Sequence, residues 1–399
     1  MRHAVLSEPW FPGIGGSIQL FDALYGRHFP AGDSVHIIAG GGHAHGALDA
    51  RYPRPVTRFD DVRYPWMRPE SAALYARMTA ATLAIVRREG VGFLHCGRVI
   101  PEGLVGLAVH RLTGLPFSVW VHGEDVSIYR RYAVKKRLMP LVFDASRAVF
   151  ANSSFTQGRA LLAGAAPDKL HVINPAVDAE AFAGPFDTAD LRARFGLDGR
   201  TVMLTVGRLT RRKGHDVTLE ALARMRPGGL LDRLTWLVLS DGEIEDDLKA
   251  QCRALGLDDV VRWVGPVAAA DLPRYYAVAD LFVHPNRTLA DDDVEGFGMV
   301  FLEASAAGVP VLGGRSGGVV DAVAEGRSGL LVDGTDVDAV AAALTQLLGD
   351  PALRERLAEG GRQWARTFSW TTQAARVRAI SLGLGDPGSD PREDVYAPA

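Results

Sequence analysis

The stretch DVEGFGMVFLEASAAGVPVLGG, residues 293–314, places a glycine-spaced loop before an apolar segment and a short run typical of a buried strand. If a helix begins near Gly298, Glu303 lies about one and a half turns inside it. Glu303 is also the only charged residue between Glu295 and Arg315. A buried carboxylate without a partner costs several kcal/mol or becomes protonated. We therefore expect Glu303 to meet either the hydroxyl groups of a ligand or an arginine of the core.

Short apolar runs alternate with helical segments over most of the chain, with one Gly- and Pro-containing interruption at 182–190. Apolar runs of this kind are typical of buried parallel strands. We expect an α/β fold of two Rossmann-like parallel-sheet domains, 1–181 and 190–367, facing a central cleft where ligands bind beyond the carboxyl ends of the strands. The expected strands cover residues 2–7, 34–40, 91–96, 117–123, 148–153, 170–174, 201–209, 234–242, 260–265, 281–286, 309–314 and 328–333, and helices are expected at 70–88, 135–145, 216–225 and 336–348.

The length and the last residues add to this division. At 399 residues the chain exceeds the roughly 250–300 residues at which a single core stops growing. A helix at about 368–383 is expected to pack back on the first domain. The tail 384–399 is rich in Pro and Asp, a composition typical of disorder.

The bulk composition indicates a soluble protein. Hydrophobic residues make up 47% and charged residues 23%, and the formal net charge of −3 argues against binding nucleic acid through bulk positive charge. The two cysteines, Cys96 and Cys252, lie far apart without CxxC spacing, which excludes a disulfide framework and a cysteine-rich metal site. The sequence shows no signal peptide and no apolar run of 18 residues, so we expect a cytoplasmic location.

Four glycine-rich loops at strand ends are candidates for binding an anion: residues 13–17, 207–214, 295–298 and 313–318. Glycine lets backbone N–H groups point outward at the start of a helix, where they favour negative charge. In the second loop, Arg208 and Lys213 follow a strand end, a pairing suited to a diphosphate. The alternative is a solvated basic loop, since Arg211 and Arg212 are also charged and are expected to face water.

The sequence EGFG at 295–298 with Glu303 resembles the EGFG…E signature of retaining glycosyltransferases with the GT-B fold, the family 4 group. Other matches occur in the expected order over roughly residues 1–380. They are PGIGGS at 12–17, VHGED at 121–125, ANSS at 151–154, the GR…KG pattern at 207–214, and AEGRSGLLV at 324–332. The combination is specific, whereas each motif alone is weak.

The resemblance implies that the second domain binds a nucleotide-sugar donor and the first an acceptor. Glu303 would hold the ribose hydroxyls, and Glu295 would act at the transferred sugar. Glycines at 296 and 298 let the backbone come close to such a ligand. The backbone expected around the sugar belongs to Gly296, Phe297, Gly298 and Met299.

The same resemblance assigns the charges. Arg208 and Lys213 would neutralise the diphosphate, aided by Gly15 and Gly16 of the first domain, and His122 matches the family's active-site histidine near the sugar. Fixed cations aimed at the leaving phosphate oxygen stabilise the charge that grows there, so no metal and no other cofactor is expected.

Several features leave alternatives open. The run DDD at 291–293 has the form of a metal-binding DxD, although a solvated loop is favoured, and His122 can equally be structural. GGHAHG at 41–46 lacks the partners of a metal site. Two loops depart from the family pattern, INPAVD at 173–178 and SDGE at 240–243. They put the acceptor contacts and the fit of the nucleobase in doubt.

The segment Tyr129–Phe143 carries five basic residues between Arg130 and Arg137 and then an apolar run. A basic amphipathic helix can lie on an anionic membrane surface. The alternative is a solvated helix face. On the membrane interpretation, the acceptor would be lipid-linked and the enzyme peripheral at the inner membrane face.

These observations predict a metal-independent retaining glycosyltransferase of glycan biosynthesis. It would move a hexose from GDP-mannose or a UDP-hexose to a hydroxyl acceptor that is lipid-linked, a glycan or a small molecule. A sugar-nucleotide epimerase or phosphorylase on the same fold and a non-catalytic sugar-nucleotide-binding protein remain alternatives. A nicotinamide oxidoreductase is disfavoured because GIGGS at 13–17 lacks the full GxGxxG frame.

Overall fold

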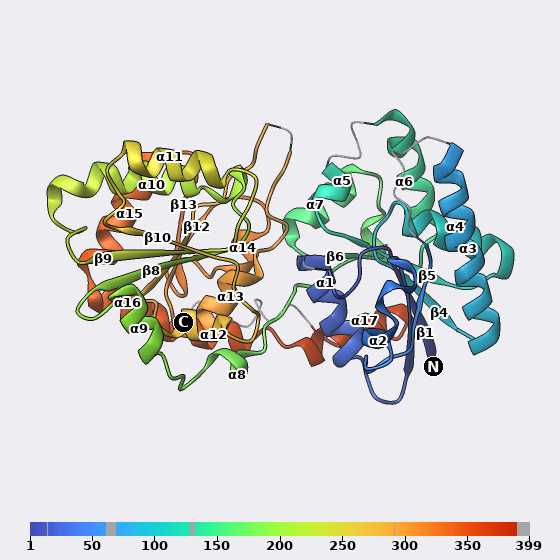
Figure 1. Ribbon diagram of the computed structural model, residues 1–399. Helices are drawn as coiled ribbons and strands as arrows, with labels where there is room; N and C mark the ends of the chain where they lie inside the picture. Colours follow the sequence, from blue (N-terminus) through green and yellow to red (C-terminus); the bar gives the residue numbers. More distant parts are fainter. Residues whose placement is uncertain (14, 61–68, 128–131, 291, 389–399) are drawn as a thin grey trace. The chain divides into compact units, whose positions relative to one another are not determined.

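The computed structural model describes residues 1–13, 15–60, 69–127, 132–290 and 292–388 (Figure 1). The chain divides into two compact units. Unit 1 contains Met1–Pro175 and a second piece that begins at Trp370, and unit 2 contains Ala176–Ser369. The first change of unit thus falls at Ala176, ahead of the interruption at 182–190.

Unit 1 is built on a sheet of seven parallel strands in the order β3-β2-β1-β4-β5-β6-β7. Six of them were expected from their apolar runs, and all of these except the edge strand β7 are buried on both faces as in other all-parallel sheets. The edge strand β3 was not predicted, because it has only three half-buried residues. The strands are β1 Arg2–Ser7, β2 Ser34–Ala39, β3 Val56–Arg58, β4 Phe93–Cys96, β5 Phe117–Val121, β6 Ala148–Ala151 and β7 Leu170–Val172.

Among the helices of unit 1, α3, α4, α5, α6 and α7 share one apolar core with this sheet. Ser153, from the ANSS motif, caps α7 by accepting a hydrogen bond from the Thr156 N–H at 3.2 Å. The helices are α1 Gly16–Phe21, the π-helix η1 Asp22–Arg27, the 3₁₀ helices η2 Gly42–His45 and η4 Pro167–Lys169, α2 Gly46–Asp49, α3 Pro69–Glu89, α4 Glu102–Thr113, α5 Glu124–Ser127, α6 Ala133–Ala145, α7 Ser154–Leu162 and α17 Trp370–Ser381.

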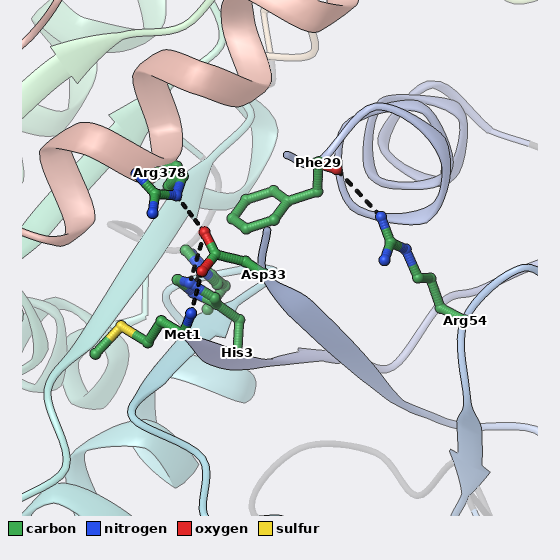
Figure 2. Close-up of polar contacts among 7 residues, drawn as sticks. Met1, His3, Phe29, Asp33, Arg54 and Arg378 are labelled. Atoms are coloured by element: carbon green, nitrogen blue, oxygen red, sulfur yellow. Dashed lines mark hydrogen bonds and ion pairs between the residues drawn. The ribbon is translucent and has the colours of Figure 1, made fainter. Parts of the chain in front are cut away.

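Helix α17 returns to unit 1 from the far end of the sequence. Its Arg378 pairs with Asp33, a carboxylate only 4% exposed that also meets the amino terminus (Figure 2). Burial alone would raise the pKa of Asp33, but these cationic partners lower it. Beyond the helix, Asp386 pairs with Arg376 at 2.7 Å, so the tail is held as far as this residue, and 389–399 lie outside the described residues.

Unit 2 is built on a sheet of six parallel strands in the order β10-β9-β8-β11-β12-β13, all expected from the sequence. The chain leaves β8 toward β9 and β10 on one side and returns to β11 on the other, so β8 and β11 flank the switch point where such sheets bind ligands. The strands are β8 Thr201–Val206, β9 Leu234–Leu239, β10 Val261–Gly265, β11 Leu281–His284, β12 Val311–Gly314 and β13 Gly329–Val332.

The helices of unit 2 complete a second, separate core. Aspartates cap α15 and α16 among them: Asp336 accepts from the Ala339 N–H at 3.0 Å, and Asp350 from the Leu353 N–H at 2.9 Å. The helices are α8 Ala179–Phe182, α9 Ala189–Phe195, the 3₁₀ helices η5 Arg211–Lys213 and η6 Arg226–Gly228, α10 His215–Met225, α11 Glu245–Ala254, α12 Leu272–Ala277, α13 Met299–Ala306, α14 Val319–Ala322, α15 Val337–Gly349 and α16 Pro351–Arg366. Within the described part of the chain, no helix has the length and apolar character needed to cross a membrane.

Candidate active site

Helix α13 and the loop before it carry the EGFG residues. The helix begins at Met299 with Gly298 as its N-cap, as the sequence predicted. Gly298 has φ +93°, and a Cβ there would lie 2.7 Å from the Phe301 ring, so glycine is required by both conformation and space. Phe297 is buried against Phe368, with ring centroids 6.1 Å apart, and anchors the loop to unit 2.

Glu295 lies in a buried ion cluster. Its Oε2 accepts from Lys213 Nζ at 2.5 Å, from Arg212 Nη1 at 2.8 Å and from Asn286 Nδ2 at 3.3 Å. The side chains of Glu295, Lys213 and Arg212 are only 14%, 9% and 17% exposed. Burial raises the pKa of Glu295, but the two cations outweigh it and lower the pKa to about 2. Glu295 is therefore an anion throughout the physiological range.

The orientation of the Arg212 side chain differs from what the sequence led us to expect. It was expected to face water, yet it turns inward, and its Nε also pairs with Asp293 Oδ1 at 3.1 Å. Of the adjacent pair Arg211 and Arg212, it is Arg211 that fits the solvated interpretation, with a side chain 61% exposed near Asp247. Asp293, from the DDD run, is thus an ion-pair partner of Arg212. Apart from the residues the structure leaves undescribed, Asp291 among them, no three His, Cys, Asp or Glu side chains gather in a way that could hold a metal ion.

Glu303 has a partner that neither expectation named. Its Oε2 accepts a hydrogen bond from the Tyr276 hydroxyl of α12 at 2.8 Å. Burial raises the pKa of Glu303, while the hydrogen bond from Tyr276 and the charge of Lys213 act in the opposite direction. The partner of Glu303 is thus a buried tyrosine and not the core arginine considered from the sequence. Glu303 also lies close enough to Lys213 for the charge of the lysine to affect its pKa.

Lys213 is positioned by a tight turn between η5 and α10. Gly214 makes this turn with φ +76°, and a Cβ there would lie 2.2 Å from the Pro285 carbonyl oxygen. Burial lowers the pKa of Lys213, and Glu295 only partly compensates. A Cβ at Gly207, the end of the β8 turn, would lie 3.6 Å from Lys213 Nζ, so the lysine reaches back to the strand end. Arg208 is exposed beside it.

Two buried histidines lie close to this lysine, and neither was predicted as a site residue from the sequence. His284 ends β11 and His215 begins α10, with ring centroids 5.3 Å apart. Burial and the charge of Lys213 lower the pKa of His215 to about 3 and that of His284 also well below its usual range, so both are neutral. Among the described residues, neither ring nitrogen of either histidine has a hydrogen-bond partner.

The glycines of the 313–318 loop have a packing role. The Gly318 N–H donates to the Glu295 carbonyl at 2.9 Å. A Cβ at Gly317 would lie 2.2 Å from the Glu295 oxygen, and one at Gly318 would lie 2.0 Å from the Gly296 oxygen. This loop, expected as an anion site, is pressed onto the backbone that presents Glu295 and holds it in place.

His122 follows β5 in unit 1. Its Nε2–H donates to the Gly97 carbonyl at 2.9 Å, and its own N–H donates to Asp125 Oδ1 at 2.9 Å. The ring stacks on Trp120 at 6.2 Å with 5° between the planes. Burial lowers the pKa of His122, although Asp125 opposes this, so a neutral ring with a lone pair on Nδ1 is favoured.

The remaining predicted residues of unit 1 are Gly15 and Gly16 and the basic segment. Gly16 begins α1, and a Cβ added at Gly15 would meet no atom within 4 Å. Helix α6 exposes Val134, Leu141 and the charged Lys136 and Arg137, whereas Lys135 is buried. Residues 129–131 of the predicted membrane segment lie outside the described residues.

Two family models match the chain in succession: Glycosyltransferase Family 4 over residues 21–181 and Glycosyl transferases group 1 over residues 187–364. A relative from Mycolicibacterium smegmatis, the GDP-mannose-dependent alpha-(1-6)-phosphatidylinositol monomannoside mannosyltransferase, is 34% identical over 290 residues, 72% of this chain and 75% of the relative. The chain is a family 4 glycosyltransferase. A D-inositol 3-phosphate glycosyltransferase from Frankia alni is 36% identical to this glycosyltransferase over 293 residues, 69% of this chain and 70% of the relative.

Solved structures place the glycosyltransferase in the GT-B fold. Anabaena Alr3699/HepE in complex with UDP has a TM-score of 0.80 at 21% identity, covering 96% of this chain and all of that one. Sucrose-phosphate synthase from Thermosynechococcus elongatus has a TM-score of 0.76 at 22% identity, covering 96% and 98%. Membership of the family makes the protein an enzyme that uses a nucleotide sugar. The epimerase, phosphorylase and non-catalytic alternatives are therefore set aside.

Proposed function

We propose that this glycosyltransferase moves mannose from GDP-mannose to a hydroxyl acceptor with retention at the anomeric carbon. The observation that carries the proposal is the buried Lys213–Glu295–Arg212 cluster at the carboxyl edge of the unit 2 sheet. GDP-mannose is chosen over a UDP-hexose because mycobacterial relatives 34% and 36% identical are named as GDP-mannose-dependent.

The cations of the cluster suit the departure of a diphosphate. When the bond between the anomeric carbon and the diphosphate breaks, its electron pair passes to a phosphate oxygen. The acceptor oxygen forms the new bond, and its proton leaves with the diphosphate. Lys213, fixed by its ion pair, and the exposed Arg208 can stabilise the growing negative charge, so the reaction is proposed to need no metal.

The two glutamates take different parts. Glu295 is ionised, since its pKa lies at about 2, so it cannot supply a proton. It can accept hydrogen bonds from sugar hydroxyls beside Gly296, Phe297, Gly298 and Met299 and favour a cationic sugar. Glu303 already accepts from Tyr276 at Oε2 and can accept a ribose hydroxyl at Oε1.

His122, Gly15 and Gly16 are proposed to act on the same donor from unit 1. The Gly97 carbonyl fixes the proton of His122 on Nε2, which leaves Nδ1 as an acceptor for a sugar hydroxyl. The open space at Gly15 allows a phosphate to approach the backbone at the start of α1.

The acceptor is proposed to carry an inositol phosphate, free or lipid-linked. Both kinds of relative are named for inositol-containing acceptors, a phosphatidylinositol monomannoside in one case and D-inositol 3-phosphate in the other. Helix α6 exposes Val134 and Leu141 together with Lys136 and Arg137, which favours contact with an anionic membrane on the cytoplasmic side.

A donor experiment tests the reaction. Thermal shifts with GDP, UDP and their sugar conjugates identify the base, and a ligand at 100 times its Kd stabilises by about 2.7 kcal/mol. Transfer from GDP-mannose is then measured with and without EDTA, and the anomeric configuration of the product is read by NMR. Lys213→Ala should abolish transfer, whereas Lys249→Ala, a lysine paired with Glu245 on α11, should not. Inversion, loss of activity in EDTA or stabilisation by UDP alone would each overturn part of the proposal.

A membrane experiment tests the acceptor surface. Sedimentation with vesicles containing anionic phospholipid should bring down the wild type, and the K136E/R137E variant should remain in solution. The matched control R77E/R87E reverses two exposed charges on α3 and should sediment normally. Equal sedimentation of all three proteins would show that Lys136 and Arg137 do not carry the membrane contact, and a wild type that stays in solution would leave a free inositol phosphate as the acceptor.

A further inference from the structure

Ser240, directly after β9, has a backbone conformation that a serine rarely adopts. Its φ is +93°, in the left-handed region that glycine tolerates and other residues avoid. Among the described residues, the only other non-glycine with positive φ is Asp292, at +61°. Both lie in loops that follow strands of the unit 2 sheet at its carboxyl edge. Strained backbone conformations of this kind are concentrated at functional sites, because they persist only where the surrounding structure enforces them.

The neighbours of Ser240 belong to the loop that carries the proposed diphosphate ligands. Leu239 pairs with Val206 in the sheet, so Ser240 lies beside Gly207, the residue before Arg208. The Ser240 N–H donates to the Gly265 carbonyl at 2.7 Å, and the Asp241 carbonyl accepts from the Leu209 N–H at 2.8 Å.

The same turn cannot relax easily. A Cβ at Gly242 would lie 2.4 Å from the Leu209 carbonyl oxygen, so the turn is pressed onto the loop 207–210. Together with the backbone bonds on either side, this fixes Ser240 in its conformation. A glycine would adopt the same φ without strain. What serine adds at this position is a hydroxyl group.

That hydroxyl has no internal role in the parts of the chain that the structure describes. Ser240 is half-buried, and its side chain forms no hydrogen bond there, unlike Thr205 on the neighbouring strand, which donates to the Val283 carbonyl at 2.7 Å. We propose that Ser240 is a donor-binding residue whose hydroxyl hydrogen-bonds the nucleoside diphosphate of the sugar donor next to Arg208. This inference rests on the proposed function and adds a contact to the same site.

Two substitutions separate the hydroxyl from the backbone. Ser240→Ala removes the hydroxyl and keeps a side chain at φ +93°, and Ser240→Gly removes the hydroxyl and the strain together. Binding of GDP, GMP and inorganic pyrophosphate is measured by calorimetry, and Tm is measured without ligand. Thr345→Ala, which removes an exposed hydroxyl on α15, is the matched control.

Both Ser240 variants are expected to bind GDP about 3- to 30-fold more weakly than the wild type, the range of one hydrogen bond to a neutral or charged group. The Gly variant should melt about 2 °C above the Ala variant, because it is free of the strain. Weaker binding of pyrophosphate as well places the contact on the phosphates, and weaker binding of GDP and GMP alone places it on the nucleoside.

The inference is overturned if both variants bind GDP as the wild type does, because the strain is then only structural. It is also overturned if the Gly variant is no more stable than the Ala variant. Failure of the wild type to bind any nucleoside diphosphate would instead refute the proposed function. A change of the same size in Thr345→Ala would show that the effect is not specific to Ser240.

Discussion

Replacing Glu295 by glutamine tests whether the ion cluster is as strongly coupled as its geometry indicates. Glutamine keeps the shape of the side chain and its acceptor oxygen but removes the charge. Lys213 and Arg212, now 2.5 Å and 2.8 Å from Oε2, would then be buried beside each other without an anion between them. We expect unit 2 to be clearly less stable.

The size of the effect follows from the pKa of Glu295, which falls from an ordinary value of 4.5 to about 2. At about 1.4 kcal/mol for each pKa unit, the fold favours the ionised form by ~3 kcal/mol. At Lys213 burial prevails and lowers the pKa, so part of this gain is offset there. Breaking a buried pair leaves an uncompensated charge, and we expect a net loss of about 2–4 kcal/mol.

Urea unfolding followed by circular dichroism measures this loss. Because the folded pKa is depressed, the contribution of Glu295 is complete above pH 4.5 and is lost as the pH falls toward 2. The difference between E295Q and the wild type should therefore be the same at pH 6 and pH 8. Asp338→Asn, which removes the exposed partner of Arg224, should leave stability close to that of the wild type, because exposed ion pairs contribute little. A loss in E295Q no larger than in this control would show that Glu295 does not stabilise unit 2 through the cluster.

Three further substitutions have defined outcomes. Tyr276→Phe removes the donor to Glu303 and should destabilise unit 2 by about 1–2 kcal/mol in urea unfolding; an unchanged midpoint would mean that another group replaces it. Gly214→Ala introduces a Cβ 2.2 Å from a backbone oxygen at φ +76° and should weaken GDP binding in calorimetry as the lysine turn shifts; equal affinity would contradict this. Arg378→Ala leaves Asp33 buried without its α17 partner and should lower the Tm of unit 1 by several degrees, whereas an unaltered Tm would show that the amino terminus suffices.

The fold was predictable because its strands, apart from the edge strands β3, β7, β10 and β13, are buried on both faces. A parallel strand under helices appears in the sequence as an unbroken apolar run, and twelve such runs became strands. The helix at Gly298 was predictable for a different reason, since its glycine precedes an apolar helical segment. Strand β3, Val56–Arg58, carries neither signal, because three half-buried residues at an edge have no pattern to recognise.

The partners within the site were less accessible to sequence reasoning. Arg211 and Arg212 are adjacent and chemically identical, yet one is exposed and the other meets Glu295, 83 residues away. Which of them turns inward depends on η5, a single turn whose orientation no periodicity reveals. Likewise Tyr276 reaches Glu303 only because α12 and α13 pack in the same unit. Charged residues in a sequence indicate that an ion cluster can form, but the tertiary fold determines which of them take part in it.

Buried polar groups were the least visible. His215 and His284 occur in runs that read only as the start of a helix and the end of a strand, so no spacing marks them. Their unpartnered nitrogens become evident only when burial is known. The glycines could be recognised in the sequence, but their role could not. Close packing of backbone on backbone and close approach of a ligand both require a residue without a side chain.

The return of α17 to unit 1 has a consequence for protein synthesis and for engineering. Unit 2 is continuous in sequence and is fully translated before Arg378 is made, so until then Asp33 lacks this partner. Unit 1 is thus completed after its neighbour, although its strands are translated first. A chimaera that exchanges unit 2 with that of a relative must therefore be joined twice, near 176 and near 370, if the recipient is to keep its own final helix.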